Sequence, residues 1–375
     1  MSWSWFVLGA GVLVPWNAWI TARYPYVHAD RWITVTYLPI TFISVFVLSV
    51  TVTSPSFSTF RVYGGFAMYI ACLVVAPMVT ALPILLLFVG ISAFADALAQ
   101  AALFGLAGSN QDDPKRCTQL LASGTSISGI FTSLLWIATR AVLPDAAAEV
   151  AYFWTCAALC FAAVFSYRHW YGRGGLSVES PTSLSSTRTI AEMTTIVAKR
   201  TATPREPLQV EPATTATRHV SSDVLSVLRK VYGPLFALTA VYWVTISIFP
   251  GVLQEDVSSS WTPPIAILLF NVCDAIGKFL EPLPITSRAL LTATASRVLF
   301  IPMFLAAIAV HAHGAAICLL AAALGVTNGW LTITAFDAIQ TNVDDEDEYL
   351  AGQVAVAFLM LGLNLGAGSS WLIAS

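Results

Sequence analysis

Three polar residues recur at helical spacing within the apolar stretch 262–281. Asn271, Asp274 and Lys278 stand at positions i, i+3 and i+7, so a helix would carry all three on one stripe about two turns long. A carboxylate accepts hydrogen bonds, an ammonium donates them and an amide does both, which suits an uncharged ligand with several hydroxyl groups. The alternative is that Asp274 and Lys278 only neutralise each other and hold their helix in the protein. The neighbouring amide on the same stripe favours a joint binding role.

Asp96 and Gln100 stand one turn apart in a second apolar stretch, residues 82–108. The Gln100 amide matches the alternating donors and acceptors on the edge of a nucleobase or a similar heterocycle. A hydrogen bond between two helices is the alternative role for this glutamine. Asp96 has no basic partner nearby in the sequence, so we expect it to be protonated at rest and consider it a candidate proton carrier.

The stretch Val14-Pro-Trp-Asn17 lies near the middle of a third apolar run. Pro15 removes a backbone donor and kinks a helix, which leaves carbonyls that a cavity or polar neighbours must satisfy. Asn17 can brace this kink, and Trp16 can offer an aromatic face to a flat ring or simply pack in the core. With Ile20 added, the predicted substrate-binding residues are Trp16, Asn17, Ile20, Asp96, Gln100, Asn271, Asp274 and Lys278.

These residues lie in apolar runs of the length that a helix needs to cross a bilayer, roughly 20 residues. Of the 375 residues, 57% are hydrophobic and 10% are charged, which excludes an ordinary soluble enzyme. The predicted fold class is therefore an all-α polytopic membrane protein with 11 transmembrane helices. The predicted spans are residues 3–22, 32–54, 62–80, 82–108, 117–140, 148–168, 231–252, 262–281, 290–311, 314–338 and 350–374.

A stretch rich in Ser, Thr, Pro and charges divides these spans into six and five. Such a composition cannot bury enough apolar area to fold alone. The predicted organisation is an amino-terminal six-helix bundle at residues 1–170, a disordered cytosolic linker at 171–228 and a carboxyl-terminal five-helix bundle at 229–375.

Basic residues predict the orientation in the membrane, because cytosolic connections are enriched in Lys and Arg. With a cytosolic amino terminus, the inner side collects Arg61, Lys115, Arg116, Arg168, Arg173, Arg188, Lys199, Arg200, Arg205, Arg218, Arg229, Lys230 and Arg288, against Arg23, Arg31 and Arg140 outside. The carboxyl terminus is then extracellular, and we expect the plasma membrane as the location. The acidic run Asp344–Glu348 is interpreted as a solvated loop, whereas Arg297 and Asp337 are expected to be structural or interfacial.

Several classes of function find no support in the sequence. The formal net charge of −3 gives no basic surface for nucleic acid. Walker, His-Glu-x-x-His and Gly-x-Ser-x-Gly motifs are absent, and the six cysteines lack metal-ligand spacing. We therefore expect no catalytic residues, no metal and no cofactor other than a possible coupling proton, in a protein that is not an enzyme. The expected partners are a small solute and the lipid bilayer, and the chain is expected to act as a monomer.

Seven segments in sequence order resemble the equilibrative nucleoside transporter family along nearly the whole chain outside the linker. The most specific is Phe270-Asn-Val-Cys-Asp-Ala-Ile-Gly-Lys278, which is similar to the family signature Phe-Asn-x-x-Asp-x-x-Gly-Arg. The others are Leu8-Gly-Ala-Gly-Val-Leu-Val-Pro-Trp-Asn17, Gln100-Ala-Ala-Leu-Phe-Gly-Leu-Ala-Gly108, Ser123-Gly-Thr-Ser-Ile-Ser-Gly129, Arg297-Val-Leu-Phe-Ile-Pro302, Thr327-Asn-Gly-Trp330 and Ala351-Gly352 with Leu361-Gly-Leu-Asn-Leu-Gly-Ala367.

The resemblance implies a major-facilitator-like 6+5 architecture, with two bundles around a central cavity and alternating access by rocking. It also implies that Gln100 holds the nucleobase, that Asp274 and Lys278 hold the ribose, and that Trp16 lines the cavity. Two residues depart from the family pattern. Lys278 replaces the usual Arg and loses its bidentate geometry, which predicts weaker ribose contact or a preference for a bare nucleobase. Asp96 stands where many members have a small residue, which adds a titratable acid.

The expected function is therefore transport of nucleosides, purine nucleosides in the first place, and also of nucleobases, either facilitative or coupled to protons. Three alternatives remain open at this point. A facilitator for a sugar or another polyhydroxylated solute would also use Asp274 and Lys278, a membrane receptor would bind the ligand without flux, and an intramembrane enzyme would transform it.

Overall fold

A computed structural model describes residues 3–22, 29–52, 54–171, 221–249 and 262–373. Every regular element in these ranges is helical. Nine helical segments among them are long and apolar enough to cross a membrane, and large apolar side chains such as Phe60, Phe165 and Leu319 are exposed on their surfaces. Apolar side chains on this scale face lipid rather than water. The predicted fold class, an all-helical polytopic membrane protein, is confirmed.

The helices follow the predicted spans in order. The first six are α1 Trp3–Thr21, α2 Ala29–Thr51, α3 Ser58–Val75, α4 Leu82–Gly108, α5 Pro114–Val142 and α6 Asp145–Tyr171, with the short 3₁₀ turns η1 Pro55–Phe57 and η2 Ala76–Met78 flanking α3. The later ones are α8 Ser221–Ile248, α10 Thr262–Phe279, α11 Ser287–Ser296, η3 Arg297–Leu299, α12 Phe300–Ala309, α13 Gly314–Thr341 and α14 Glu348–Ile373. Helices α1 and α10 are not among the nine segments above, so the count of eleven crossings stays a prediction.

Two prolines explain where the later helices are irregular. Pro234 in α8 cannot donate to the preceding turn, and Val231 just before it leaves the helical conformation at φ −124°, ψ 16°. The predicted ninth span is broken at η3, where Pro302 removes the donor that would otherwise bond to the carbonyl of Val298.

The predicted linker needs one correction at its carboxyl end. Residues 221–228 belong to α8 rather than to the linker, because Val227 and Val231 continue an apolar face that is fully buried. The chain divides into two compact units, one formed by residues 1–168 and 220–375 and the other by residues 169–219. Residues 172–220 lie outside the described residues, and the division into two bundles and a linker stays a prediction.

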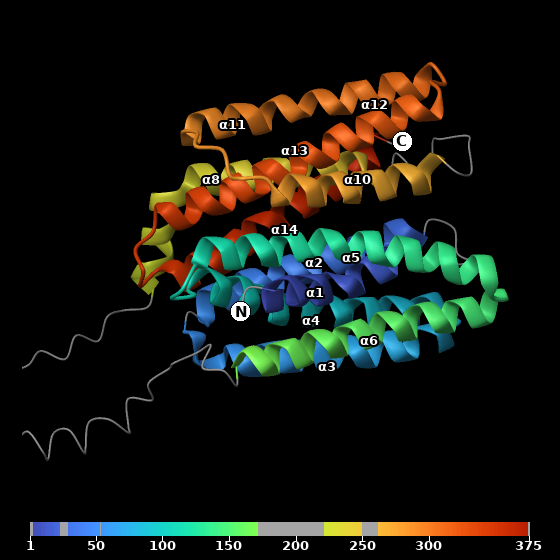
Figure 1. The fold of residues 1–375 in the computed structure, drawn as a ribbon, viewed down its shortest axis with the longest axis horizontal. Helices are drawn as coiled ribbons and strands as arrows, with labels where there is room; N and C mark the ends of the chain where they lie inside the picture. Colours follow the sequence, from blue (N-terminus) through green and yellow to red (C-terminus); the bar gives the residue numbers. More distant parts are fainter. Residues whose placement is uncertain (1–2, 23–28, 53, 172–220, 250–261, 374–375) are drawn as a thin grey trace, which may run out of the picture. The chain divides into compact units, whose positions relative to one another are not determined.

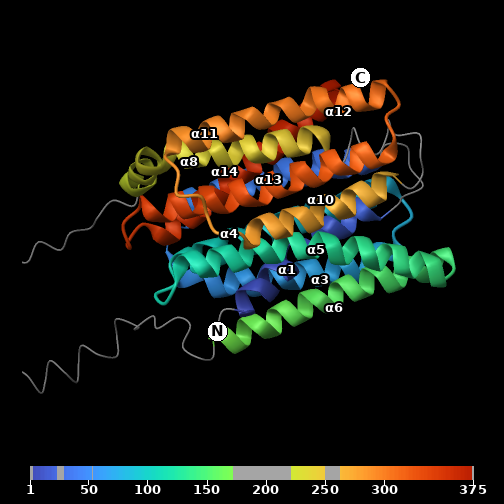
Figure 2. The same cartoon turned by 45° about the horizontal axis from the view of Figure 1, so that its top comes forward.

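Within the larger unit, helices α1–α6 form what we call the amino-terminal half and helices α8–α14 the carboxyl-terminal half. Helix α1 packs on α5, and α2 and α3 pack on α4, whereas α10 packs on α13 and α14 packs on α8. The halves meet where α4 and α2 contact α14 and where α5 contacts α10. Figures 1 and 2 both show α6 and the α11–α12 pair on opposite sides of this seam. The site therefore has to be sought along the seam.

Candidate functional site

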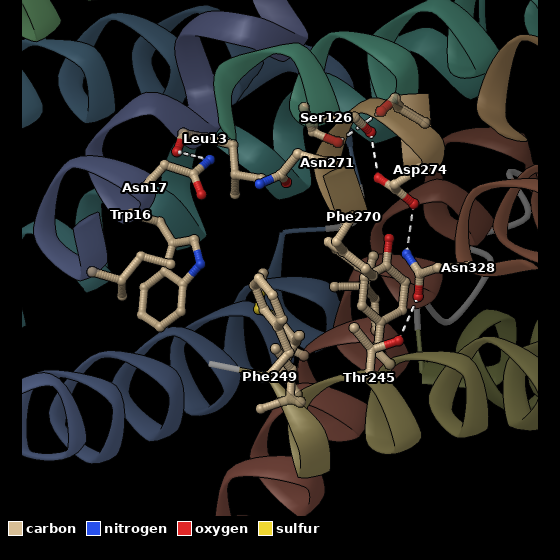
Figure 3. A pocket seen from close by; sticks show the side chains of 18 of the residues that line it. Leu13, Trp16, Asn17, Ser126, Thr245, Phe249, Phe270, Asn271, Asp274 and Asn328 are labelled. Atoms are coloured by element: carbon tan, nitrogen blue, oxygen red, sulfur yellow. Dashed lines mark hydrogen bonds between the residues drawn. The ribbon is translucent and has the colours of Figure 1, made fainter. Parts of the chain in front are cut away.

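A cavity of about 130 Å³ lies between the two halves. Helices α1, α2, α4 and α5 line it from one side, and α8, α10, α13 and α14 line it from the other. Figure 3 shows Trp16 and Asn17 across an open space from Phe270, Asp274 and Asn328. All eight residues of the predicted site line this cavity, namely Trp16, Asn17, Ile20, Asp96, Gln100, Asn271, Asp274 and Lys278.

Asp274 is the centre of a continuous hydrogen-bond network, which Figure 3 shows. Its Oδ1 accepts a hydrogen bond from Asn328 Nδ2 on α13 at 2.7 Å, and Asn328 Oδ1 accepts from Thr245 on α8 at 2.7 Å. Its Oδ2 accepts from the hydroxyl of Ser126 on α5 at 2.5 Å. The Asp274 side chain is 6% exposed, so this network connects a buried charge to both halves of the protein.

Lys278 forms an ion pair with the same carboxylate. Its Nζ lies 3.0 Å from Asp274 Oδ2 and donates to the hydroxyl oxygen of Thr125 on α5 at 3.3 Å. The neutralising pair that the sequence offered as an alternative is therefore present, and both members also line the cavity. Asn271, on the same stripe of α10, donates to the backbone carbonyl of Ile267 at 3.0 Å and has a partly exposed side chain.

Arg297 supports this network from outside the cavity. It is 2% exposed and donates to the carbonyl of Val241 at 2.9 Å and to the hydroxyl of Thr245 at 3.0 Å. The structural role expected for Arg297 matches these contacts. Because Thr245 in turn donates to Asn328, the arginine fixes the far end of the Asp274 network.

The residues around Pro15 organise the amino-terminal side of the cavity. The proline leaves the carbonyl of Gly11 without its usual donor, and the thiol of Cys160 on α6 lies 3.7 Å from that oxygen as a weak donor. Asn17 Nδ2 donates to the carbonyl of Leu13 at 3.1 Å and to the hydroxyl of Ser128 at 2.6 Å, so it braces α1 against itself and against α5.

Trp16 contacts an aromatic ring of α2. The centres of the Trp16 and Tyr37 rings are 4.7 Å apart in a tilted arrangement, and the indole is 8% exposed. Trp16 thus both packs against α2 and lines the cavity, so the two interpretations of this residue are compatible.

Asp96, Gln100 and Tyr37 form a corner of the cavity, and Tyr69 contacts Asp96 from α3. The hydroxyl of Tyr69 on α3 donates to Asp96 Oδ1 at 2.7 Å. Asp96 Oδ2, Gln100 Oε1 and the Tyr37 hydroxyl are buried without a hydrogen-bond partner in the described part of the chain. Buried polar atoms are usually bonded to protein, water or ligand. This corner therefore offers a ligand polar atoms of Asp96, Gln100 and Tyr37.

Stacked aromatic rings line the cavity on two further sides. Phe104 of α4 stacks on Phe336 of α13 with ring centres 5.1 Å apart, which joins the two halves. Phe249, which directly follows α8, stacks on Phe270 of α10 with ring centres 4.8 Å apart, within the carboxyl-terminal half. Both pairs suit a flat ring, since aromatic faces prefer such partners.

Polar contacts close the seam at the end where α4 finishes and α5 begins, which we call the α4–α5 end. Arg61 Nη1 donates to Gln353 Oε1 at 2.7 Å and to the Tyr349 hydroxyl at 3.4 Å, and that hydroxyl lies 2.6 Å from Ser58 Oγ. The sequence placed Arg61 in a connection, and this was wrong. It is 2% exposed because α3 begins at Ser58 and carries it into the interface with α14.

Two further contacts of this end join α5 to α13. Lys115 and Asp337 form an ion pair at 2.8 Å, in keeping with the interfacial role expected for Asp337. Gln340 Nε2 donates to the hydroxyl of Thr118 at 2.5 Å. Hydrogen bonds and an ion pair therefore hold the two halves together at the α4–α5 end.

Several site residues escaped the sequence analysis. Ser126 and Asn328 lie inside the segments Ser123–Gly129 and Thr327–Trp330, whose family resemblance was the available signal. Tyr37 and Tyr69 carry no such signal, because a single tyrosine in an apolar helix looks like a core residue.

The family model described as Nucleoside transporter matches residues 86–375 of the chain. The chain belongs to the equilibrative nucleoside transporter family. It is therefore a membrane transporter for nucleosides.

Relatives of this transporter align along nearly its whole length. Equilibrative nucleotide transporter 1 of Arabidopsis thaliana is 29% identical over 98% of the chain and 84% of the relative. Equilibrative nucleotide transporter 8 of the same plant is 28% identical over 98% of the chain and 93% of the relative. Human equilibrative nucleoside transporter 4 is 24% identical over 97% of the chain and 80% of the relative.

Proposed function

We propose that this transporter moves purine nucleosides, and also nucleobases, by alternating access of one central site. The observation that carries the proposal is the meeting of the polar residues of α1, α4 and α10 on one cavity between the halves. A path shared by two halves suits passage through the protein better than a closed binding pocket. We also propose that eleven helical spans, with α11 and α12 counted as one, all cross the membrane in a 6+5 arrangement and that the chain acts as a monomer in the plasma membrane.

The proposed roles follow the chemistry of each part of the cavity. Gln100 and Asp96 bind the edge of the base, because their unused oxygens match its N–H groups. Trp16 contacts the face of the base. Asp274 and Lys278 bind the ribose hydroxyls as acceptor and donor. Asn17, Ile20 and Asn271 complete the lining without a direct role in reading the base.

The proposed orientation has a cytosolic amino terminus and an extracellular carboxyl terminus, supported by the excess of basic residues on one side. The α4–α5 end is then cytosolic. We propose that its contacts through Arg61, Lys115 and Gln340 close the cavity toward the cytosol in this conformation.

Uptake by purified protein in liposomes tests this function. We expect saturable uptake of labelled adenosine, inosine and hypoxanthine. Gln100→Ala should lower kcat/KM for all three by roughly tenfold or more, because a lost hydrogen bond at a desolvated site costs about 1–3 kcal/mol. Wild-type flux in both Gln100→Ala and Asp274→Ala would rule out the proposed site. Inhibition of adenosine uptake by glucose would indicate a sugar facilitator. Saturable binding without flux would indicate a receptor, and a changed product would indicate an enzyme.

The proposal extends to the driving force, for which Asp96 is the proposed proton carrier. In the described part of the chain, the hydroxyls of Tyr69 and Tyr37 interact with this carboxyl group, and neither of them is a cation. We expect an outside-acid gradient to accelerate adenosine uptake severalfold over an inside-acid gradient in the wild type. Asp96→Asn, which keeps the shape but carries no titratable proton, should remove this difference. An unchanged response to the gradient would discard Asp96 as the carrier.

A further inference from the structure

The hydroxyls of Thr125 and Ser126 form hydrogen bonds with the side-chain atoms of Asp274 and Lys278 that are proposed to bind the ribose. Ser126 donates to Asp274 Oδ2, and Thr125 accepts from Lys278 Nζ. Two neighbouring hydroxyls thus satisfy one acceptor and one donor, the pattern that the two vicinal hydroxyls of a ribose would present to the same pair. All four side chains line the cavity and are at most 7% exposed.

Asn328, which donates to the other carboxylate oxygen of Asp274, does not stand in for a ribose hydroxyl. Asn328 approaches Oδ1 from the same half and is itself held by Thr245, which Arg297 holds in turn. That side of the carboxylate is therefore a fixed support. Ser126 belongs to α5 of the amino-terminal half, so its bond is the one that crosses the seam at this carboxylate.

The contact is the cavity-facing end of a longer seam between α5 and α10. Gln119, Ser123 and Ser126 follow one another at helical spacing on α5. Gln119 Nε2 donates to the carbonyl of Lys278 at 3.0 Å, and the Ser123 hydroxyl lies 3.4 Å from the same carbonyl. Loss of the Ser126 and Thr125 contacts would loosen the seam at the cavity and leave its α4–α5 end fastened.

We propose that Thr125 and Ser126 are internal substitutes for the ribose, which hold Asp274 and Lys278 in the empty cavity and give way to the hydroxyls of an arriving nucleoside. This inference rests on the proposed function, in which Asp274 and Lys278 bind the ribose. The two residues set specificity through competition: a solute with a vicinal diol can replace their hydroxyls, and a bare nucleobase cannot. When the ligand replaces these hydroxyls, Asp274 and Lys278 of α10 bind the ligand and no longer bind Ser126 and Thr125 of α5.

The decisive variant is Ser126→Ala in full-length protein reconstituted into liposomes. Without the competing hydroxyl, the KM for adenosine should fall roughly tenfold, which corresponds to one hydrogen bond to a charged group. The KM for 2′,3′-dideoxyadenosine and for hypoxanthine should stay unchanged, because neither has the diol. Thr125→Val, which keeps the side-chain shape, should lower the adenosine KM in the same direction by a smaller factor and provides an independent measurement.

Thr132→Val is the matched control on the same helix. Among the described residues its hydroxyl donates only to carbonyls of α5, those of Ser128 and Gly129, so its removal should leave every KM unchanged. An adenosine KM that is unchanged or raised in both Ser126→Ala and Thr125→Val overturns the inference, since the hydroxyls would then be neutral or would bind substrate themselves. Absence of adenosine uptake by the wild type instead overturns the proposed function and the inference with it.

Discussion

Replacing Asp274 by asparagine is expected to lower kcat/KM for adenosine by roughly a hundredfold. Asparagine keeps the shape and an acceptor for Asn328, but it removes the anion opposite Lys278, whose side chain is 4% exposed. Removing one partner of a buried ion pair also lowers the free energy of unfolding by about 3–5 kcal/mol, because the other charge stays buried without compensation. Uptake should be measured per correctly inserted molecule, so that loss of protein is not counted as loss of transport.

A double variant separates the ligand role of Asp274 from simple charge balance. Asp274→Asn combined with Lys278→Met removes both charges and should restore thermal stability toward that of the wild type. Adenosine uptake should remain low, because neither the acceptor nor the donor for the ribose is present. Recovery of uptake together with stability would mean that the pair only neutralises itself, which was the alternative interpretation of this stripe.

The second large effect is expected from one methyl group on α5. Gly124→Ala would place its Cβ against backbone atoms of α1, 2.7 Å from the nitrogen of Ala10 and 3.0 Å from the carbonyl carbon of Gly9. Backbone cannot turn aside as a side chain can, so α1 and α5 must separate. Overpacking of this kind costs about 1–3 kcal/mol and sometimes more. We expect a lower thermal midpoint of the detergent-solubilised protein and a loss of uptake, because α1 carries Trp16 and Asn17.

Gly64→Ala is the matched control for this experiment. A Cβ at Gly64 of α3 meets no other atom within 4 Å, so the same change adds no clash there. Alanine is the better helix former by up to about 1 kcal/mol, and the thermal midpoint should stay or rise. If both variants lowered the thermal midpoint and the uptake equally, any added methyl group would harm the protein. The explanation through the contact of α1 with α5 would then be wrong.

The two sides of the cavity differ in how their polar groups are satisfied. Around Asp274, both carboxylate oxygens have partners. Around Asp96, one oxygen accepts from Tyr69 and the other is unused in the described part of the chain. A ligand therefore has to displace existing bonds at the ribose end and can add new bonds at the base end. This difference explains why hydroxyl competition is expected for nucleosides and not for nucleobases.

The amino-acid sequence by itself determined the helices and the stripes of polar residues along them. Apolar runs specify helices because the hydrophobic period and the turn-forming breaks are local properties of the chain. The spacing of Asn271, Asp274 and Lys278 put them on one face for the same reason, and all three line the cavity together with the other five predicted residues. Local rules also explain the irregularities at Pro234 and Pro302, although the sequence analysis did not anticipate them.

Only the tertiary structure decided which partner each polar group has. Ser126 and Asp274 are 148 positions apart, and Arg61 and Gln353 are 292 positions apart. Pairings at such separations depend on how the helices are rotated and shifted against one another, which small residues such as Gly124 and Gly9 permit at particular points of contact. Helical spacing says which side chains share a face, but the neighbour on the next helix is set by packing of the whole molecule.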